Sequence, residues 1–350
     1  MRKESIFIGV CILLSSIILC GFFIREDELD EKWLKLVENS NKTFAVPIPD
    51  TMSFCGEPVP LLRFDVRESL DYEMLKNVYW HSNTYLSLKR ANRWFPIIEP
   101  ILKKNNIPDD FKYLAIIESN FANVVSPVGA SGYWQFMKNT GLEYDMEIND
   151  EVDDRYNVEK ATEAACKYLN DAHSRLKNWT LVAASYNMGV AGLAKRIEQQ
   201  GVFLYYDLYL NSETARYVYR ILSTKLIMEN PTKYGYYLRL KDRYPQIPTQ
   251  KISVDSSINN LVKFAIDNKV NYKLLKYFNP WLRDTKLTNP KRKVYQIELP
   301  TPEFYNYYLF FTNNNSQQLM NGNEVLNIDT SNKKVQNLNL PVNTDTSIKN

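Results

Sequence analysis

The sequence predicts a mainly α-helical protein that ends in a small α+β module. Between residues 66 and 230 apolar side chains recur at helical spacing, and no alternating strand pattern is present. From about residue 239 the pattern changes to a strand, two helices and a second strand, which is long enough for a small separate module. The predicted strands are 251–254 and 294–299, and the predicted helices between them are 258–267 and 272–278.

Capping and turn residues divide the helical part into segments. Pro96 and Pro100 interrupt one apolar stretch, so two helices are expected there instead of one. Asp109 and Asp110 suit the first turn of a helix, where negative charge is favourable, and Asn157 is a candidate N-cap. The predicted helices are 70–79, 84–94, 97–104, 109–121, one whose first residues are 133–140, 158–176, 179–188 and 214–229. Residues 126–132 are predicted to form a loop of small residues, and 143–155 a solvated acidic loop.

The N-terminal end is predicted to lie outside the folded part. Residues 6–24 carry no charge and follow Arg2 and Lys3, so this segment can span a bilayer, with the rest of the chain exported. An uncleaved anchor and a lipoprotein signal ending at Cys20 are both open, and simple secretion is a third option. Residues 313–350 contain no aromatic residue and are rich in Asn, Thr, Ser and Lys, which predicts disorder. The predicted segments are an anchor or signal at 1–24, a linker and packing segment at 25–65, a helical domain at 66–235, the module at 236–302 and the tail at 313–350.

Composition and the remaining motifs exclude several classes of function. A formal net charge of only +3 gives no case for nucleic-acid binding. His81 and His173 are the only histidines and have no Cys or His at ligand spacing, so neither zinc nor a Ser-His triad is expected. The acidic loop lacks the calcium-loop pattern, so we expect no metal and no cofactor. Cys55 and Cys166 either pair with each other or remain as two free thiols.

Glu118 is the most informative residue, because it lies on the apolar face of its predicted helix. Residues three, four and seven positions earlier share its face, and these are Ala115, Leu114 and Phe111. A carboxyl group in such surroundings loses hydration, so its pKa should rise and it could serve as a general acid near neutral pH. A structural glutamate bonded to a backbone N–H at the helix end is the alternative.

Four sequence blocks extend this interpretation. They are E-S-x-F from Glu118, S-P-V-G-A-S-G-x-W-Q-F-M from Ser126, A-x-Y-N-x-G from Ala184 and E-T-x-x-Y-V from Glu213. In this order they resemble the soluble lytic transglycosylase domain of the membrane-bound lytic murein transglycosylase D type, over about 65–230. The resemblance implies a lysozyme-like helical catalytic domain.

The resemblance also implies an activity and a partner, the glycan strands of peptidoglycan. The family cleaves the β-1,4 bond between N-acetylmuramic acid and N-acetylglucosamine and leaves a 1,6-anhydro end. Glu118 would be the single catalytic residue, acting as acid and then as base, because the C6 hydroxyl of the substrate supplies the nucleophile. This differs from glycosidases with two carboxylates.

The carried-over substrate-binding residues lie in the later blocks. Core packing or a helix contact is the alternative role for each. They are Ser126, Gln135, Met137, Tyr186, Asn187 and Tyr217. The stretch from Glu118 to Ser126 is one residue shorter than the usual family spacing, which leaves the position of Ser126 open.

The C-terminal module resembles a LysM domain, a small βααβ unit that binds peptidoglycan. The stretch that carries this resemblance is INNLVKFAIDNKVNYKLLKYFNPWL, and it includes the Asn279 that often follows the second helix. Residues 254–257 replace the usual Gly-Asp/Glu-Thr, so we interpret the module as a degenerate LysM. A non-catalytic glycan-binding scaffold and a hydrolytic muramidase of lysozyme type remain alternatives to the transglycosylase. The expected location is the cell envelope, with the catalytic domain on the periplasmic side of a membrane anchor.

Overall fold

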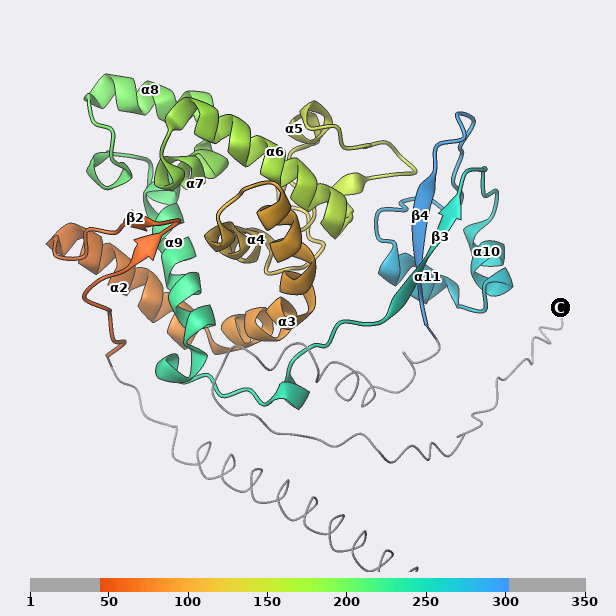
Figure 1. Ribbon diagram of the computed structural model, residues 1–350, viewed down its shortest axis with the longest axis horizontal. Coiled ribbons are helices and arrows are strands. Elements are labelled where there is room, and N and C mark those ends of the chain that lie inside the picture. The colour runs from red at the N-terminus through yellow and green to blue at the C-terminus, as the bar shows by residue number, and fades with distance from the viewer. Residues whose placement is uncertain (1–44, 302–350) are drawn as a thin grey trace, which may run out of the picture.

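The computed structural model describes residues 45–301, which form a group of helices beside a small α+β unit (Figure 1). This confirms the predicted fold class, mainly α with a small C-terminal α+β module. The helices of the first part are α2 (Phe64–Tyr79), α3 (His81–Lys104), α4 (Lys112–Ser119), α5 (Lys138–Glu143), α6 (Val158–Leu176), α7 (Trp179–Met188), α8 (Val190–Gln200) and α9 (Ser212–Glu229).

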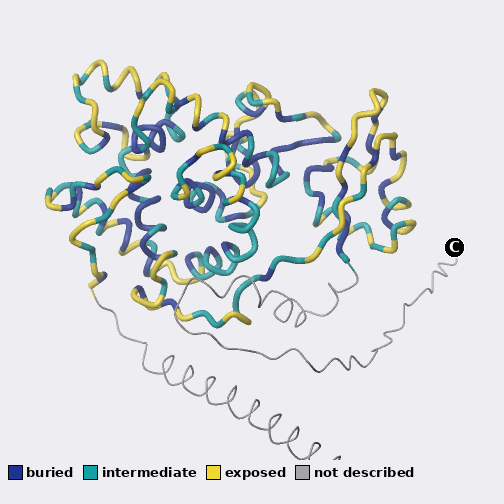
Figure 2. Tube along the Cα trace, in the orientation of Figure 1, coloured by how far each residue is buried: buried dark blue, intermediate teal, exposed yellow. Residues whose placement is uncertain are grey.

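Helix α4 lies at the centre of the helical part, and the other helices pack around it (Figure 1). It contacts α3 and α9, while α9 also packs on α2 and α7, and α6 packs on α3 and α7. Figure 2 shows the buried residues concentrated at this centre and the exposed ones along the outer helices. The side chains of Phe111, Leu114 and Ala115 are fully buried there. The short helix α4 is therefore held in place by tertiary packing on several sides.

The C-terminal module has the predicted order of strand, two helices and strand. Strand β3 (Thr249–Val254) pairs antiparallel with β4 (Tyr295–Pro300), and helices α10 (Leu261–Asp267) and α11 (Tyr272–Phe278) lie between them in the chain. The register places Ile252 opposite Ile297. Asn279 is fully buried, and its amide donates to the backbone of Leu275 and of Glu298, which ties the end of α11 to β4.

The described part of the predicted linker packs on the helices. Strands β1 (Ser53–Phe54) and β2 (Glu57–Pro58) form a two-stranded hairpin that the sequence did not suggest. Phe54 is fully buried against the core. The carboxylate of Glu57 accepts bonds from the backbone N–H groups of Trp179 at 2.6 Å and Thr180 at 2.9 Å, so it binds the first turn of α7.

The prediction of two helices around Pro96 and Pro100 was wrong, because α3 continues through both residues. A proline in a helix removes one backbone N–H and leaves the carbonyl four residues earlier without its helical partner. Those carbonyls belong to Asn92 and Pro96, which are both partly exposed and line a surface pocket that water can enter. The penalty is therefore smaller here than in a core.

The expected helix start at 133–140 was placed too early. Helix α5 begins at Lys138, after a turn in which Ser131 forms bridges with Val125 and Phe136 and Gln135 has φ 51°. Gly132 permits this turn, because it has φ +78° and an added Cβ would lie 1.8 Å from the carbonyl oxygen of Arg155. Close backbone packing thus overrides the helical pattern of the sequence.

Helix α8 was not predicted, since no helix was expected between residues 188 and 214. Gly189 provides the junction between α7 and α8 with φ +81°, and α8 resumes at Val190. Gly192 lies inside α8 without interrupting it. Gly189 alone therefore marks the junction between the two helices.

The acidic loop is a docking surface and not a solvated loop. Val152 and Tyr156 are buried within the apolar cluster of the C-terminal module. The backbone N–H of Asp153 donates to the carbonyl of Trp281 at 2.9 Å, and that of Arg283 donates to the carbonyl of Glu151 at 2.7 Å. The loop therefore fastens the module to the helical part through both apolar contacts and backbone hydrogen bonds.

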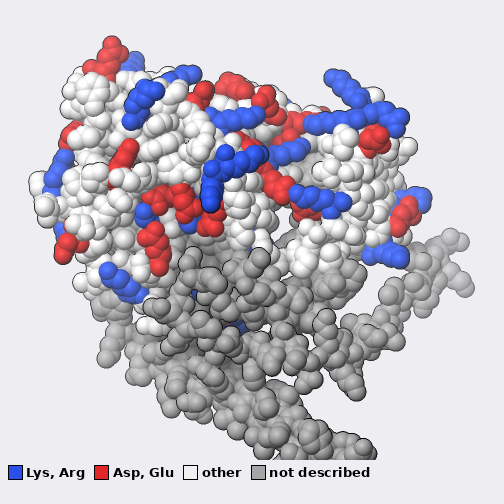
Figure 3. Space-filling view, in the orientation of Figure 1, with Lys and Arg blue, Asp and Glu red and all other residues white. Residues whose placement is uncertain are grey.

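Charged side chains at this junction add further links. The carboxylate of Glu147 contacts Lys293 and accepts from the Tyr295 hydroxyl at 3.0 Å, while Lys251 forms an ion pair with Glu159 at 2.7 Å. Figure 3 shows basic and acidic side chains interspersed on the face that it views. Within the part of the chain that is described, no group of three or more His, Cys, Asp and Glu is placed to hold a metal ion.

Several predictions concern residues outside the described range. The apolar segment 6–24, Cys20 and the tail 313–350 all lie there. Within residues 45–301, none of the helices is both long enough and apolar enough to cross a membrane. Cys55 and Cys166 are both free thiols, which decides between the two alternatives left by the sequence.

Candidate active site

Glu118 lies in the last turn of α4, and the C-cap residue Asn120 has the left-handed conformation with φ 50°. The amide of Asn120 donates to Asn83 at 2.8 Å, which ties this helix end to α3. The predicted apolar face is present, since Phe111, Leu114 and Ala115 are all buried. Glu118 continues that face to the wall of a pocket, where its side chain is half-buried.

Loss of hydration dominates the electrostatics of Glu118. It raises the pKa of the carboxyl group from 4.5 to about 7. The hydrogen bond from Tyr217 and the positive charge of Arg220 act in the opposite direction, and the negative charge of Glu213 adds a smaller increase. A carboxyl group with a pKa close to neutral can donate and accept a proton under the same conditions.

Tyr217 is the direct partner of Glu118. It comes from α9, is 1% exposed, and its hydroxyl donates a hydrogen bond to Oε1 of Glu118. Burial and the neighbouring Glu118 raise the pKa of Tyr217 well above its ordinary value, so it remains a donor at any pH of interest. The structure thus brings together one residue from the first sequence block and one from the last.

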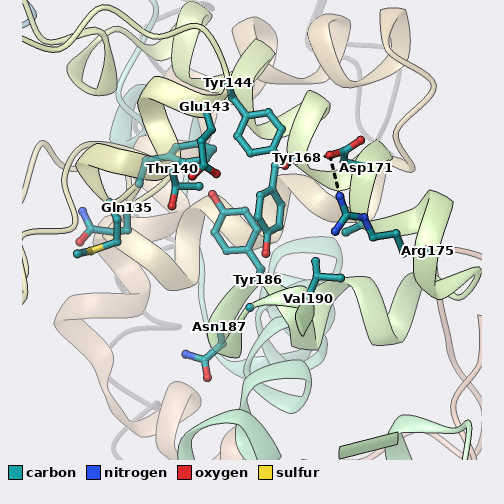
Figure 4. A pocket seen from close by; sticks show the side chains of 14 residues that line it. Gln135, Thr140, Glu143, Tyr144, Tyr168, Asp171, Arg175, Tyr186, Asn187 and Val190 are labelled. Carbon is teal, nitrogen blue, oxygen red and sulfur yellow. Dashed lines mark hydrogen bonds and ion pairs between the residues drawn. The ribbon is translucent and has the colours of Figure 1, made fainter. Parts of the chain in front are cut away.

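A pocket of about 520 Å³ collects most of the predicted substrate-binding residues (Figure 4). Gln135 and Met137 line it from the turn before α5, and Tyr186 and Asn187 line it from the end of α7. Figure 4 shows Tyr186 beside the ring of Tyr168, with their ring centroids 5.1 Å apart. Aromatic rings with polar edges are suited to contacts with sugars.

Hydrogen bonds hold these lining residues in place. The Tyr186 hydroxyl donates to the carbonyl of Trp134 at 2.8 Å, so it bonds to the turn and not to Glu118. The Gln135 amide donates to the carbonyl of Gly132 at 2.7 Å, which keeps it within its own turn. These contacts fix the shape of the pocket, while the Met137 side chain remains 44% exposed.

A second pocket of about 360 Å³ contains Glu118 itself. Its walls come from α2, α3, α4 and α9, and Glu213 lies on its α9 side. The Asn187 amide donates to Glu213 at 2.9 Å, and the Thr214 hydroxyl donates to the Asn187 carbonyl oxygen at 2.7 Å. Because Asn187 lines the first pocket and Glu213 the second, this cluster joins the two pockets.

Two predicted residues, Tyr217 and Ser126, line neither of these pockets, and whereas Tyr217 still bonds to Glu118, Ser126 lies in the small-residue loop. The Ser126 hydroxyl accepts from the backbone N–H of Ala130 at 3.0 Å, and its own N–H donates to the carbonyl of Ala130 at 2.8 Å. It therefore closes the small-residue loop. The shortened spacing after Glu118 was the sequence signal that left its position open.

The loop and turn near the first pocket are supported by a buried ion pair. Arg155 and Asp153 lie 2.7 Å apart and are both nearly fully buried. The Arg155 guanidinium also donates to the carbonyls of Gly129 at 3.2 Å and Phe136 at 3.1 Å. This role was not predicted, because both residues belong to the segment expected to be a solvated loop.

The polar residues of α9 near Glu118 were not predicted either. Glu213 and Thr214 were part of a sequence block that carried the family resemblance, but no role was predicted for them, although they bind Asn187. Arg216 and Arg220 line the pocket of Glu118, and their spacing from Glu213 places all three on one helix face. A charged stripe on a helix whose other faces are apolar was the available signal.

Comparison with known proteins identifies two domains in the chain. Residues 95–208 match the family of the transglycosylase SLT domain, and residues 250–303 match that of the soluble lytic transglycosylase C-terminal LysM-like domain. The first match includes Glu118 and the lining residues of the first pocket, and the second includes β3, β4, α10 and α11. The chain therefore carries an SLT transglycosylase domain followed by a LysM-like module.

Curated relatives agree with these domains. Membrane-bound lytic murein transglycosylase D of Escherichia coli (strain K12) is 26% identical over 253 residues, which cover 70% of this chain and 55% of that protein. A putative tributyltin chloride resistance protein of Alteromonas sp. (strain M-1) is 27% identical over 125 residues, 35% of this chain and 60% of that protein. The chain thus spans little more than half the length of either relative.

Among solved structures, an inactive mutant of lytic transglycosylase Slt from Pseudomonas aeruginosa is similar. The sequence identity is 20%, the TM-score is 0.33, and the similarity covers 43% of this chain and 26% of that one.

Proposed function

We propose that this protein is a peptidoglycan lytic transglycosylase. It cleaves the β-1,4 bond between N-acetylmuramic acid and N-acetylglucosamine and leaves a 1,6-anhydromuramic acid end. The observation that carries the proposal is the Glu118 carboxyl group, whose pKa is raised to about 7 at the wall of a pocket. The SLT domain match over residues 95–208 supports it.

In the first step Glu118 acts as a general acid. Its proton passes to the glycosidic oxygen, and the bond between that oxygen and C1 of the muramic acid breaks. Charge of oxocarbenium type develops on the sugar ring as Glu118 becomes a carboxylate. The Tyr217 hydroxyl and the Arg220 guanidinium both favour this carboxylate, as their effects on the Glu118 pKa indicate.

In the second step the same carboxylate acts as a base. It takes the proton from the C6 hydroxyl of the muramic acid, and that oxygen bonds to C1 to close the 1,6-anhydro ring. No water is consumed, and Glu118 returns to its protonated form. A second carboxylate is not needed, because the substrate supplies the nucleophile.

The remaining residues position the substrate in this proposal. Tyr186 and Gln135 present an aromatic face and an amide in the pocket of about 520 Å³, where sugar rings adjoining the scissile bond would lie. Asn187 is held by Glu213 and Thr214 at the point where the two pockets join. It is the best-placed group to bind an N-acetyl substituent near Glu118.

The cell envelope is the proposed location. The apolar segment 6–24 would anchor the chain, either as an uncleaved helix or through lipidation at Cys20, and the catalytic domain would be exported. The relative from Escherichia coli is described as membrane-bound, which supports this location. The LysM-like module would add a contact to glycan strands.

Analysis of the products released from purified sacculi tests the activity. Wild-type protein should release muropeptides with 1,6-anhydro ends, and Glu118→Gln should release none while its circular dichroism remains unchanged. Reducing ends would indicate a hydrolytic muramidase, and no release by the wild type would indicate a glycan-binding scaffold. Full activity of Glu118→Gln would refute the role of Glu118.

A further inference from the structure

A pocket of about 320 Å³ lies beside the connector, which we define as residues 235–248, between the turn Pro231–Tyr234 and β3. Leu88 and Phe95 line the pocket from α3. Met228 lines it from the end of α9, and Leu238 lines it from the connector. None of the residues assigned to the proposed reaction lines this pocket. The proposed reaction therefore does not account for it.

The apolar side chains of this pocket are incompletely covered. Leu88, Phe95 and Met228 pack against the hydrophobic core but are only partly buried, and the same is true of Leu238. Apolar surface in contact with water is unfavourable, so covering it with further apolar side chains is favourable. Glu99 adds a hydrogen-bond acceptor to the lining. The pocket therefore suits an occupant whose side chains have apolar faces and polar edges.

Hydrogen bonds hold the connector against the same stretch of α3. The backbone N–H of Tyr244 donates to the carbonyl of Lys89 at 3.1 Å, and the Asn92 amide donates to the carbonyl of Tyr244 at 3.0 Å. Nε of Arg93 donates to the carbonyl of Pro245 at 2.9 Å. Figure 1 shows the connector running from the end of α9 past α3 to β3. Because Asn92 also lines the pocket, the end of the connector lies close to it.

The chain leaves the module at this connector. Strand β4 ends at Pro300, and the backbone N–H of the next residue, Thr301, donates to the carbonyl of Pro248 at 3.0 Å. Pro248 is three residues from Pro245, a span of at most about 11 Å. The next ten residues, 302–311, can span up to about 35 Å when extended. They are therefore long enough to reach the pocket from Thr301.

The sequence that follows Thr301 includes an aromatic segment, residues 304–311, which lies outside the described range. It reads FYNYYLFF, so it carries no charge, and Asn306 is its only residue that is neither aromatic nor aliphatic. Each aromatic side chain has a large apolar surface, and contiguous apolar surface of this kind is rarely left exposed on a soluble protein. The tail at 313–350, in contrast, contains no aromatic residue. The aromatic segment therefore requires a surface that covers it.

We propose that the aromatic segment of this chain docks in the pocket of about 320 Å³ and covers Leu88, Phe95 and Leu238. Its tyrosine hydroxyl groups meet the polar part of the lining. The attachment at Pro248 favours this occupant over a second copy of the chain, because a tethered segment is present at a high effective concentration. The module is then held to the helical domain at two places, by the loop at 143–156 and by the aromatic segment. The inference does not depend on the proposed function.

Photo-cross-linking in the full chain locates the aromatic segment. A photo-reactive analogue of phenylalanine is placed at position 308 in place of Tyr308, and the cross-linked peptides are mapped by mass spectrometry. The expected cross-links lie within one chain and reach residues 88–96 or 228–238. The same analogue in place of Leu338, in the tail, is the control and should give no such cross-link. Cross-links from position 308 to a second copy, to lipid or only to other parts of the chain would overturn the docking.

Hydrogen exchange of full-chain variants tests whether the aromatic segment protects the connector. One variant combines four polar replacements in the segment, Tyr307→Asn, Tyr308→Asn, Phe310→Asn and Phe311→Asn. The matched control makes four apolar-to-Asn replacements in the tail, Leu319→Asn, Val325→Asn, Leu326→Asn and Leu338→Asn. Amide exchange in peptides covering 236–248 should become about tenfold faster in the first variant and stay unchanged in the control. Exchange in α4 should be the same in both variants.

Two results of the exchange measurement would overturn the inference. The first is wild-type exchange of the connector in the variant of the aromatic segment, since the segment would then not cover it. The second is an equal acceleration in every helix, which would indicate a general loss of stability and no specific contact. Faster exchange that is confined to the connector and the adjoining part of α3 would support the docking.

Discussion

The hydroxyl of Tyr217 donates a hydrogen bond to Oε1 of Glu118, and this contact links α9 to α4 at the candidate active site. It opposes the effect of burial on Glu118, because the bond favours the carboxylate whereas loss of hydration favours the protonated acid. The balance places the pKa at about 7. Helices α4 and α9, which are far apart in the sequence, therefore together determine the pKa of Glu118.

Tyr217→Phe should raise the pKa of Glu118. The hydrogen bond to the charged form is lost, and such a bond is worth about 1.5–3 kcal/mol, so the alkaline limb of activity should move upward by roughly one to two pH units. The maximal rate should fall, since the carboxylate that forms in the first step is less stable. The measurement is the pH profile of kcat/KM for release of anhydro-muropeptides. Tyr219→Phe removes another buried hydroxyl from α9 and should leave the profile unchanged.

Glu118→Gln should change how stability depends on pH. The folded-state pKa of Glu118 is raised from 4.5 to about 7, so the unfolded chain ionises first and wild-type stability falls as pH rises through this window. The variant lacks that loss, so its Tm relative to wild type should increase between pH 4.5 and 7 and then remain level. Thermal unfolding at several pH values measures it. A constant difference in Tm across the window would contradict the raised pKa.

Gly132→Ala should destabilise the protein and reduce its activity. The new Cβ would lie 1.8 Å from the carbonyl oxygen of Arg155, so the turn that carries Gln135 and Met137 must shift. Gly129→Ala is the matched control, because Gly129 also has positive φ, at +87°, but has nothing within 4 Å of the added Cβ. Gly129→Ala should lower the free energy of unfolding by about 1 kcal/mol, from backbone strain alone. Gly132→Ala should lower it by clearly more. Urea unfolding compares the two.

Asp153→Ala should be strongly destabilising. It leaves the buried Arg155 without its carboxylate partner, a change that costs roughly 3–5 kcal/mol in comparable buried pairs. Asp267→Ala removes an exposed carboxylate that lies 2.9 Å from Lys263, and it should cost less than about 1 kcal/mol. Chemical unfolding of both variants gives the comparison. Equal effects would show that the buried pair contributes no more than a surface one.

Local patterns in the sequence predicted much of the fold. Asn157 and the residues after it gave α6 with the bounds that the structure has, because an N-cap and an apolar stripe act within one helix. The helix through Pro96 and the turn at Gly132 were missed for the opposite reason. The first depends on the exposure of the residues that bear the affected carbonyls, and the second on backbone from residue 155. Neither condition is visible in the neighbouring sequence.

The candidate site was predictable to a similar degree. The position of Glu118 on an apolar helix face already indicated a carboxyl group with a raised pKa. The residues of α9 near Glu118 were harder to predict. Arg216 and Arg220 line its pocket only because α2 and α9 pack on each other, and the sequence does not show that contact. Ser126 shows the same limit, since its loop closes on Ala130 and not toward the pockets.

The burial of Val152 and Tyr156 inside the apolar cluster of the LysM-like module has a consequence for how the chain can evolve. Two side chains of the SLT domain complete the apolar core of the module. Exchange of the module alone between relatives should therefore leave that core incomplete. A recombination event near residue 236 would deliver a module whose interior lacks its partner side chains. Successful transfers should carry the loop at 143–156 together with the module, and the two segments should change in concert.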